Sequence, residues 1–197
     1  MLELILIRHG ETDSNIRGSY LGWTDIELNE TGLSQVCNLR DHLKNTKIDK
    51  IFSSPLKRAL QTAQIINENY NLDIVYTDGL KERNFGIWDD LTLEEMTQRY
   101  PSKYKAWVDD WIKYPIKDGE SAIEAYDRSA KFVRELIEKN TKGVFMLVTH
   151  LGTIRFILAY LLELGIESSW RFRVDNASIT KLEINDDYSV LTMLNNR

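Results

Sequence analysis

Two of the three histidines in this chain stand at the ends of apolar runs, beside other residues that could do chemistry. His9 follows "LELILI" and lies between Arg8 and Gly10, and His150 ends the run "GVFMLVTH". A third polar cluster, "SSPLKR", follows "KIF" and ends at Arg58. Three separate segments of the chain therefore supply two imidazole and two guanidinium groups.

This set of side chains suits a phosphate ligand. Guanidinium groups match phosphate oxygens as rigid forks, and a glycine lets the backbone approach a ligand closely. A neutral imidazole beside two cations resists protonation, so its lone pair stays available to attack phosphorus. A single histidine at a strand end would more often be structural, but burying this much cationic charge without an anion is expensive.

Metal binding is the competing interpretation of the two histidines. The chain has neither a His-x-x-x-His nor a Cys-x-x-Cys spacing, and Glu11 is the one carboxylate within either histidine motif. We therefore expect neither a metal nor another cofactor.

Apolar periodicity predicts strands that alternate with helices. Strands are expected at 2–7, 50–54, 72–76, 143–150, 177–184 and 189–195. Helices are expected at 31–45 (with His42 on its solvated side), at 56–70, on both sides of Pro101, along the amphipathic stretch from Ile123 to Ile137, and after residue 150. This order is typical of an α/β fold, a three-layer α/β/α sandwich with a largely parallel central sheet. Ligands bind at the carboxyl ends of such strands, so the three polar clusters should converge on one pocket.

Composition narrows the setting of that pocket. The 197 residues suit one domain over residues 1–197. A formal charge of −5 gives no sign of a nucleic-acid or membrane partner. One cysteine, Cys37, excludes an internal disulfide and fits a reducing, cytoplasmic location. The apolar stretch "IRFILAYLLELGI" carries Arg155 and Glu163, which predicts a buried helix rather than a membrane span. Whether the chain forms a homodimer stays open.

Taken in order, the motifs resemble those of the histidine phosphatase superfamily, also called the phosphoglycerate-mutase-like family. The matching stretches are "LIRHGETDSN", "GWTDIELNETG", "IFSSPLKRALQTA", "LKERNFGIWDD" and "VTHLGTIR", which together cover nearly the full chain. The resemblance implies a metal-independent phosphoric monoester hydrolase in which His9 is phosphorylated during turnover. It also implies a phosphate pocket made by Arg8, Asn15, Arg58 and His150.

A general acid must protonate the leaving alkoxide, and a base must deprotonate the attacking water. Glu82, Asp89 and Asp90 are the carboxylates that "LKERNFGIWDD" offers for both tasks. The resemblance selects Glu82. Asp89 and Asp90 stand where many relatives carry a Glu-Gly pair, which we interpret as a loop variation. Gly22 matches a loop that lines the site in the family.

The finer resemblance is to phosphatases rather than mutases. The chain is short for a cofactor-dependent mutase, and "THLG" departs from the His-Gly-Asn run typical of mutases. "YKAWVDDW", "DGES" and "WRFRVDNASIT" look like α-ribazole phosphatases, which remove the 5′-phosphate of α-ribazole 5′-phosphate in cobalamin biosynthesis. A broad sugar-phosphate phosphatase, a phosphoglycerate mutase and an inactive module that binds phosphorylated ligands stay open as alternatives.

Four aromatic residues recur at spacings of three, four and three residues, which predicts one helical face: Tyr104, Trp107, Trp111 and Tyr114. The stripe either packs its helix onto the domain or forms an aromatic wall for the leaving group. On the second interpretation Trp107 and Trp111 bind substrate, and Asn176 edges the pocket. Arg171 and Arg173 are either solvated or close to the site.

Overall fold

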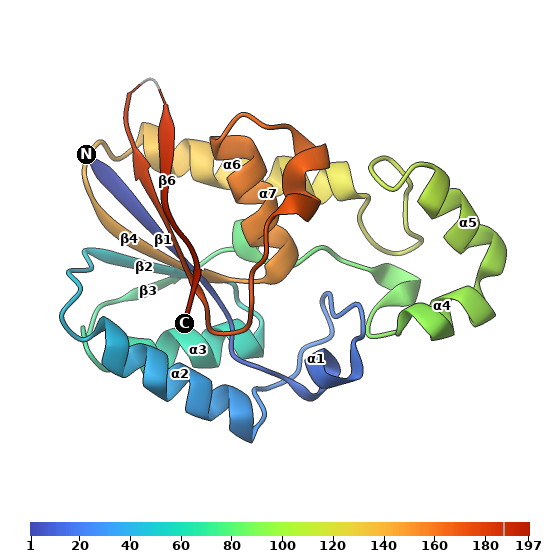
Figure 1. Cartoon of the computed structure of the whole chain (residues 1–197), viewed down its shortest axis with the longest axis horizontal. Coiled ribbons are helices and arrows are strands. Elements are labelled where there is room, and N and C mark those ends of the chain that lie inside the picture. The colour runs from blue at the N-terminus through green and yellow to red at the C-terminus, as the bar shows by residue number, and fades with distance from the viewer. Residues whose placement is uncertain (187) are drawn as a thin grey trace.

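The computed structural model describes residues 1–186 and 188–197 and contains one six-stranded sheet (Figure 1). Its strands are β1 (Leu2–Arg8), β2 (Lys50–Ser53), β3 (Ile74–Tyr76), β4 (Gly143–Thr149), β5 (Ile179–Ile184) and β6 (Ser189–Asn196). Their order is β3-β2-β4-β1-β5-β6. The first four run parallel, whereas β5 pairs antiparallel with both β1 and β6. The predicted, largely parallel sheet is confirmed.

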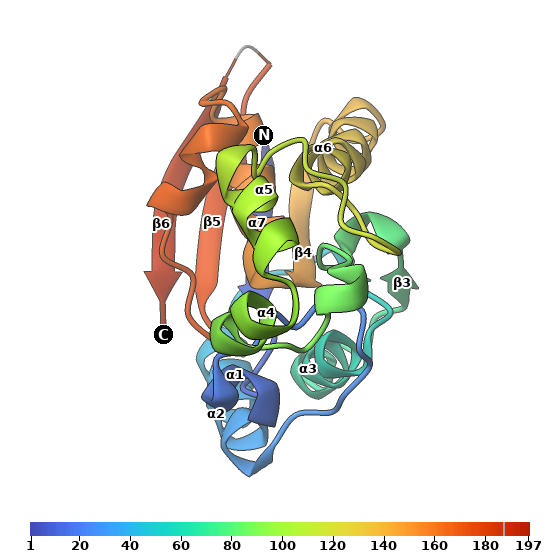
Figure 2. The same ribbon diagram turned by 90° about the vertical axis from the view of Figure 1, so that its right-hand side faces the viewer.

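Helices cover both faces of the sheet (Figures 1 and 2). The helices are α1 (Asp13–Arg17), α2 (Glu30–Leu43), α3 (Lys57–Asn67), α4 (Leu93–Arg99), α5 (Pro101–Asp109), α6 (Ala122–Glu138) and α7 (Leu151–Leu161). Helices α2 and α3 pack on one face of the sheet, and α6 and α7 pack on the other. Three short 3₁₀ turns complete the set: η1 (Asp78–Leu80), η2 (Gly86–Trp88) and η3 (Ile166–Arg171). In the described part of the chain, none of the helices is long and apolar enough to cross a bilayer.

The two faces of β1 belong to different halves of the core. Leu4 and Leu6 pack in the cluster that includes Val133 of α6 and Ile157 of α7. The alternate residue Ile5 packs in the cluster of α2 and α3. Side chains alternate across a strand, so a strand covered on both sides reads as a continuous apolar run. The three-layer α/β/α arrangement is therefore confirmed.

The prediction that four aromatic residues lie on one face of a single helix is wrong, because the helix is shorter than predicted. Helix α5 ends at Asp109, and the next residue, Asp110, leaves the helical region with φ −146°. The Asp110 carboxylate accepts a hydrogen bond from the backbone N–H of Lys113 at 3.1 Å, a local contact that competes with helix continuation. Trp111 consequently lies in the following turn rather than on the face of α5 that carries Trp107.

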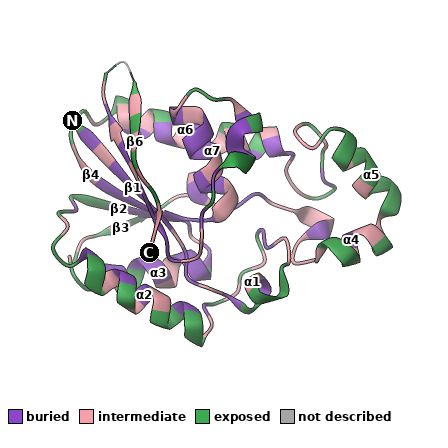
Figure 3. Cartoon of the chain, in the orientation of Figure 1, coloured by how far each residue is buried: buried purple, intermediate pink, exposed green. Residues whose placement is uncertain are grey.

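Helices α4 and α5 project beyond the carboxyl ends of the strands, at the right of Figure 1. Figure 3 shows them largely exposed, in contrast to the buried strands. A small aromatic core holds this region together, because Trp88 stacks on Tyr114 with ring centroids 5.7 Å apart and meets Trp107 edge-on at 6.1 Å. These elements overhang the edge of the sheet where the polar clusters lie.

Candidate active site

The three polar clusters meet at one edge of the sheet, as predicted. Strands β1 and β2 both pair with β4, and their last residues lie level, with Arg8 opposite Thr149 and Ser53 opposite Val148. The His9 and His150 rings that follow are 5.1 Å apart between centroids. Above them lies a cavity of about 520 Å³. Seven of the residues predicted from sequence to act in catalysis or to bind phosphate or substrate line it: Arg8, His9, Asn15, Glu82, Trp107, Trp111 and Asn176.

His9 is held as a neutral imidazole with one nitrogen free. Its Nδ1 lies 2.7 Å from the carbonyl oxygen of Gly10. A carbonyl can only accept a hydrogen bond, so Nδ1 carries the proton and Nε2 keeps its lone pair. Burial, and then the charges of Arg58 and Arg8, hold the pKa of His9 well below 6.5. The arrangement presents an uncharged imidazole between two cations, which is what a nucleophilic histidine requires.

Gly10 serves a different purpose from the one expected. A Cβ at this position would lie 2.6 Å from the carbonyl oxygen of Gly32 and 2.8 Å from the side chain of Val36. The close approach that requires glycine is therefore to the first turns of α2 rather than to a ligand. The residue that follows His9 therefore packs closely against α2.

The two arginines lie deep in the site with N–H donors unused. Arg58, in the first turn of α3, donates to the carbonyls of Gly22 at 2.6 Å and Thr24 at 3.0 Å. Arg8 donates to the carbonyl of Val174 at 2.8 Å. Neither Nε has a hydrogen-bond partner among the described residues. Burial lowers the pKa of each guanidinium to about 10, so both remain charged at neutral pH. Unsatisfied buried cations of this kind favour an anionic ligand.

His150 and Arg58 lie beneath the cavity lining. His150 is fully buried, and its Nε2 is 2.8 Å from the Ser54 hydroxyl. Its Nδ1 is left without a partner in the described part of the chain. Burial, and then the charge of Arg58, hold the pKa of His150 well below 6.5. Ser54 orients His150 through this contact, and the motif "SSPLKR" alone does not predict that role.

Asn15 and Asn176 form one unit at the cavity wall. The amide nitrogen of Asn176 donates to Oδ1 of Asn15 at 3.0 Å and to the carbonyls of His9 and Gly10 at 3.2 and 3.3 Å. Asn176 therefore ties the α1 region to the end of β1. Gly22, expected at the site, is buried outside the cavity lining and reaches the site only through its hydrogen bond to Arg58.

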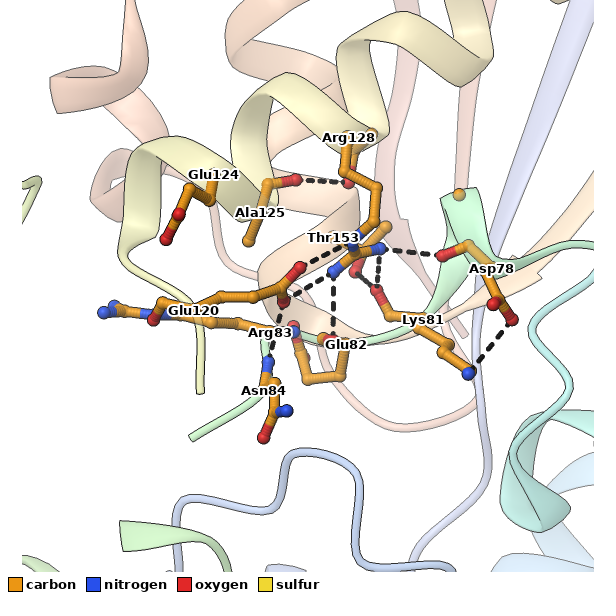
Figure 4. Close-up of polar contacts among 12 residues, drawn as sticks. Asp78, Lys81, Glu82, Arg83, Asn84, Glu120, Glu124, Ala125, Arg128 and Thr153 are labelled. Carbon is orange, nitrogen blue, oxygen red and sulfur yellow. Dashed lines mark hydrogen bonds and ion pairs between the residues drawn. The ribbon is translucent and has the colours of Figure 1, made fainter. Parts of the chain in front are cut away.

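Glu82 enters the cavity from an irregular segment, and Figure 4 shows its surroundings. Its Oε1 accepts the backbone N–H of Arg83 and its Oε2 that of Gly152, both at 2.9 Å. A Cβ at Gly152 would lie 2.5 Å from Oε1, so glycine at the start of α7 leaves room for the carboxylate. Glu82 is the carboxylate of the three candidates that lines the cavity.

Asp89 and Asp90 hold loops rather than substrate. The Asp89 carboxylate accepts three consecutive backbone N–H groups, those of Gly22, Trp23 and Thr24, at 2.7–3.1 Å. The carbonyl groups of Gly22 and Thr24 in the same loop accept hydrogen bonds from Arg58. Asp89 therefore holds the loop that positions Arg58.

Asp90 adopts φ +58°. Glycine adopts this conformation without strain, which explains the Glu-Gly pair expected here from the resemblance. The Asp90 carboxylate accepts a hydrogen bond from the Ser19 hydroxyl at 2.6 Å and pairs with Arg17 at 3.3 Å.

The outer wall of the cavity is aromatic and carries a further cation. Trp107 and Trp111 both line it, from different elements. Trp111 packs edge-on against Trp170 with centroids 5.6 Å apart, and the Arg155 guanidinium lies 5.6 Å from the Trp170 ring. Trp170 and Arg155 line the cavity but were not predicted to do so. The signal for Arg155 was its place one helical turn into α7, the helix that follows His150.

Arg171 and Arg173, whose position was left open, are both exposed, and Arg173 pairs with Asp175 at 3.1 Å. Neither lines the cavity. Across residues 1–186 and 188–197, no three His, Cys, Asp or Glu side chains gather closely enough to hold a metal ion.

Comparison with known proteins matches this chain to one family. Residues 4–197 match the family model of the histidine phosphatase superfamily (branch 1). The chain is 31% identical to the adenosylcobalamin/alpha-ribazole phosphatase of Escherichia coli K12, with coverage of 100% of this chain and 97% of the relative. It is 33% identical to phosphoserine phosphatase 1 of Hydrogenobacter thermophilus, with coverage of 99% and 92%.

A solved structure agrees with these relatives. The alpha-ribazole phosphatase from Shigella flexneri superposes with a TM-score of 0.93 at 31% identity, covering 98% of this chain and 96% of that one. Sequence, site and fold therefore lead to one conclusion: the chain belongs to the histidine phosphatase superfamily and is a phosphoric monoester hydrolase.

Proposed function

We propose that this hydrolase transfers the phosphoryl group of its substrate to Nε2 of His9 and then to water. The observation that carries the proposal is the neutral His9 ring, with Nε2 free, between two buried guanidiniums that keep N–H donors unused. Arg8 and Arg58 would receive the non-bridging phosphate oxygens and stabilise the charge that spreads over them in the transition state.

In the first step, Nε2 of His9 attacks phosphorus and a P–N bond forms. The bond between phosphorus and the leaving oxygen breaks, and that oxygen keeps the electron pair. It takes the proton of Glu82, whose carboxyl group lies in the same cavity. The alcohol departs, and Glu82 is left as a carboxylate beside the phosphohistidine.

In the second step, water attacks phosphorus and gives a proton to the Glu82 carboxylate. The P–N bond breaks, its electron pair returns to Nε2, and inorganic phosphate leaves. The second step restores Glu82 to its acid form and His9 to the neutral imidazole. One carboxyl group can serve both steps because it gives up its proton in the first step and regains a proton in the second.

We further propose α-ribazole 5′-phosphate as the substrate. Trp107, Trp111 and Trp170 give the outer cavity flat apolar walls, and stacking of a base on such a ring contributes about 1–3 kcal/mol. The likeness to relatives named as alpha-ribazole phosphatases supports the same choice.

One observation favours a second candidate, a phosphate monoester whose alcohol carries a carboxylate, such as phosphoserine. The Arg155 guanidinium lines the cavity. Burial lowers its pKa, and the charge of Glu82 opposes that shift. When Glu82 holds a proton, a substrate carboxylate would replace the lost negative charge near Arg155. The relative named as a phosphoserine phosphatase agrees with this alternative.

The test compares kcat/KM for α-ribazole 5′-phosphate, phosphoserine, ribose 5-phosphate and 3-phosphoglycerate, with EDTA present throughout. We expect α-ribazole 5′-phosphate to lead by at least about tenfold, the lower end of the stacking contribution. Preference for phosphoserine would select the second candidate. Loss of activity in EDTA, which a divalent ion restores, would contradict the metal-independent mechanism.

Rapid acid quench should be avoided in favour of alkaline denaturation, because phosphohistidine is stable in base and labile in acid. A phosphoenzyme trapped in this way from wild type supports the covalent step. Interconversion of phosphoglycerates would identify a mutase, and binding of phosphate esters without turnover would identify an inactive module. The cytoplasmic location, the single domain over residues 1–197 and the homodimer stay predictions.

A further inference from the structure

We propose that Arg128 is a positioning residue that holds Glu82 in place for proton transfer. The inference rests on the proposed role of Glu82 as general acid and base. Arg128 lies on α6, outside the cavity lining, and contacts the backbone rather than the carboxylate of Glu82. It would therefore act on the reaction only through the segment that carries Glu82.

That segment has no regular secondary structure of its own at Glu82, which lies between η1 and η2. Side chains from the neighbouring layer take the place of a hydrogen-bond ladder. The hydroxyl of Thr149 in β4 donates to the carbonyl of Leu80, and that of Thr153 in α7 donates to the carbonyl of Lys81 at 2.8 Å. The backbone position of the acid is thus set by contacts from elsewhere in the fold.

Arg128 supplies the largest share of those contacts, as Figure 4 shows. Its Nη1 donates to the carbonyls of Asp78 and Lys81 at 2.8 and 3.0 Å. Its Nη2 donates to the carbonyl of Glu82 at 3.1 Å and to the carboxylate of Glu120 at 3.0 Å, and its Nε donates to the same carboxylate at 2.8 Å. A guanidinium has five N–H donors in a rigid plane, and here every one is used.

Glu120 holds the backbone on the far side of Glu82, at Arg83 and Asn84. Its carboxylate also accepts the backbone N–H of Asn84 at 2.9 Å, and its carbonyl accepts Nε of Arg83 at 2.9 Å. The Arg128–Glu120 pair therefore fixes the backbone on both sides of the acid. Both side chains of the pair are largely buried, so the pair is less screened than a surface ion pair. Proton transfer depends on placing the acid within hydrogen-bond reach of the leaving oxygen.

The leaving group separates this role from a general loss of structure. In a two-step mechanism, kcat/KM reports the steps up to departure of the alcohol. An alkyl oxygen needs the acid's proton, whereas p-nitrophenolate leaves with little help. We expect Arg128→Met to lower kcat/KM for glycerol 3-phosphate about tenfold to a hundredfold more than for p-nitrophenyl phosphate. With p-nitrophenyl phosphate, kcat should fall more than kcat/KM, because hydrolysis of the phosphohistidine still needs Glu82 as base.

Matched variants separate geometry from charge. Arg128→Lys keeps the positive charge but loses the planar fork, and we expect it to behave like Arg128→Met. Arg134→Met, an exposed arginine on the same helix, should behave as wild type. Thr153→Val removes one contact to Lys81 and should give the same leaving-group dependence at smaller size. It keeps the proposal testable if Arg128→Met fails to fold.

Equal losses of kcat/KM on both substrates would overturn the positioning role, as would full activity in Arg128→Lys. Measuring Glu82→Gln in parallel separates this failure from that of the proposed function. If Glu82→Gln shows leaving-group dependence and Arg128→Met does not, only the role of Arg128 is wrong. If neither shows it, Glu82 is not the acid, and the proposed mechanism fails with it.

Discussion

The floor and the outer wall of the cavity are built in different ways. We use floor for Arg8 and His9, which line the cavity, together with Arg58 and His150, which are buried beneath the lining. These four residues stand at strand ends or in the first turn of a helix. The wall consists of Trp107, Trp111 and Trp170, which come from a short helix, a turn and a 3₁₀ segment. His150 and Arg58 are completely buried, whereas Trp170 is 54% exposed.

Under the proposed function, this difference would put the reacting phosphate and the groups that select the substrate at opposite ends of the cavity. Every phosphate monoester presents the same group to the floor, so the floor cannot discriminate among substrates. Under the proposed function the wall would meet the part of the substrate that varies. The wall is held by aromatic packing rather than by the sheet. Substitutions in the floor should therefore affect all substrates, and those in the wall only some.

The largest expected effect comes from the centre of the floor. His9→Ala removes the proposed nucleophile and should reduce activity to the background of the assay on every substrate. Alkaline-quench trapping should detect no phosphoenzyme, while circular dichroism remains that of wild type. Substantial turnover by this variant would contradict the covalent mechanism, and the floor could then no longer be called the site of the chemistry.

Glu82 belongs to neither the floor nor the aromatic wall, and Glu82→Gln tests whether it is the general acid. Loss of a general acid should slow hydrolysis of alkyl phosphates by about 10²–10⁴-fold, with a much smaller change in kcat/KM for p-nitrophenyl phosphate. Steady-state kinetics on the two substrates measure the difference. If both losses were equal, Glu82 would only shape the cavity and would not be the general acid.

The buried histidines of the floor should make stability fall at mildly acidic pH. In the folded protein the pKa values of His9 and His150 lie well below 6.5, whereas both return to about 6.5 on unfolding. As pH falls below 6.5, the unfolded chain binds up to two more protons than the folded one. The free energy of unfolding should then drop by up to about 2.7 kcal/mol per pH unit.

Urea unfolding between pH 7.5 and 5.5 measures this slope. Well above pH 6.5 the two histidines are neutral in both the folded and the unfolded protein, so they contribute nothing to the slope. His150→Gln should halve the slope, and His42→Gln, at an exposed position, should leave it unchanged. A flat profile would mean that the folded protein binds these protons as readily as the unfolded chain does, so that burial would not lower the pKa values of the two histidines.

The wall should give the smallest and most selective effect. Trp111→Ala or Trp170→Ala should lower kcat/KM for α-ribazole 5′-phosphate about tenfold to a hundredfold, the value of one stacked ring. Activity on p-nitrophenyl phosphate should change much less. Val108→Ala, at an exposed position on α5, is the matched control. Equal losses on both substrates would mean that the wall supports the floor rather than reading the leaving group.

Sequence reasoning predicts the floor well because sheet geometry leaves little choice. Once "LELILI", "KIF" and "GVFMLVT" are parallel neighbours, their carboxyl ends must lie at one edge. The residues that follow these ends, His9 and His150 among them, are thereby brought together. Local pattern and topology suffice there, and no long-range side-chain contact needs to be known.

The wall could not be predicted in the same way. The break after Asp109 depends on a local hydrogen bond of Asp110 that competes with a favourable aromatic periodicity. Trp170 meets Trp111 across 59 residues of sequence, through packing that periodicity does not report. Asp89 and Arg128 also contact backbone groups that are far away in the sequence. No motif in the residues around them predicts these contacts.

The contact between Glu82 and Gly152 couples two positions that are far apart in the chain. A Cβ at residue 152 would lie 2.5 Å from Oε1 of Glu82, so a larger residue there would shift the carboxylate from the position in which it accepts the backbone N–H of residue 152. Each of the two positions therefore limits the substitutions that the other tolerates. Over evolutionary time, we expect residues 82 and 152 to change together more often than two unrelated positions do.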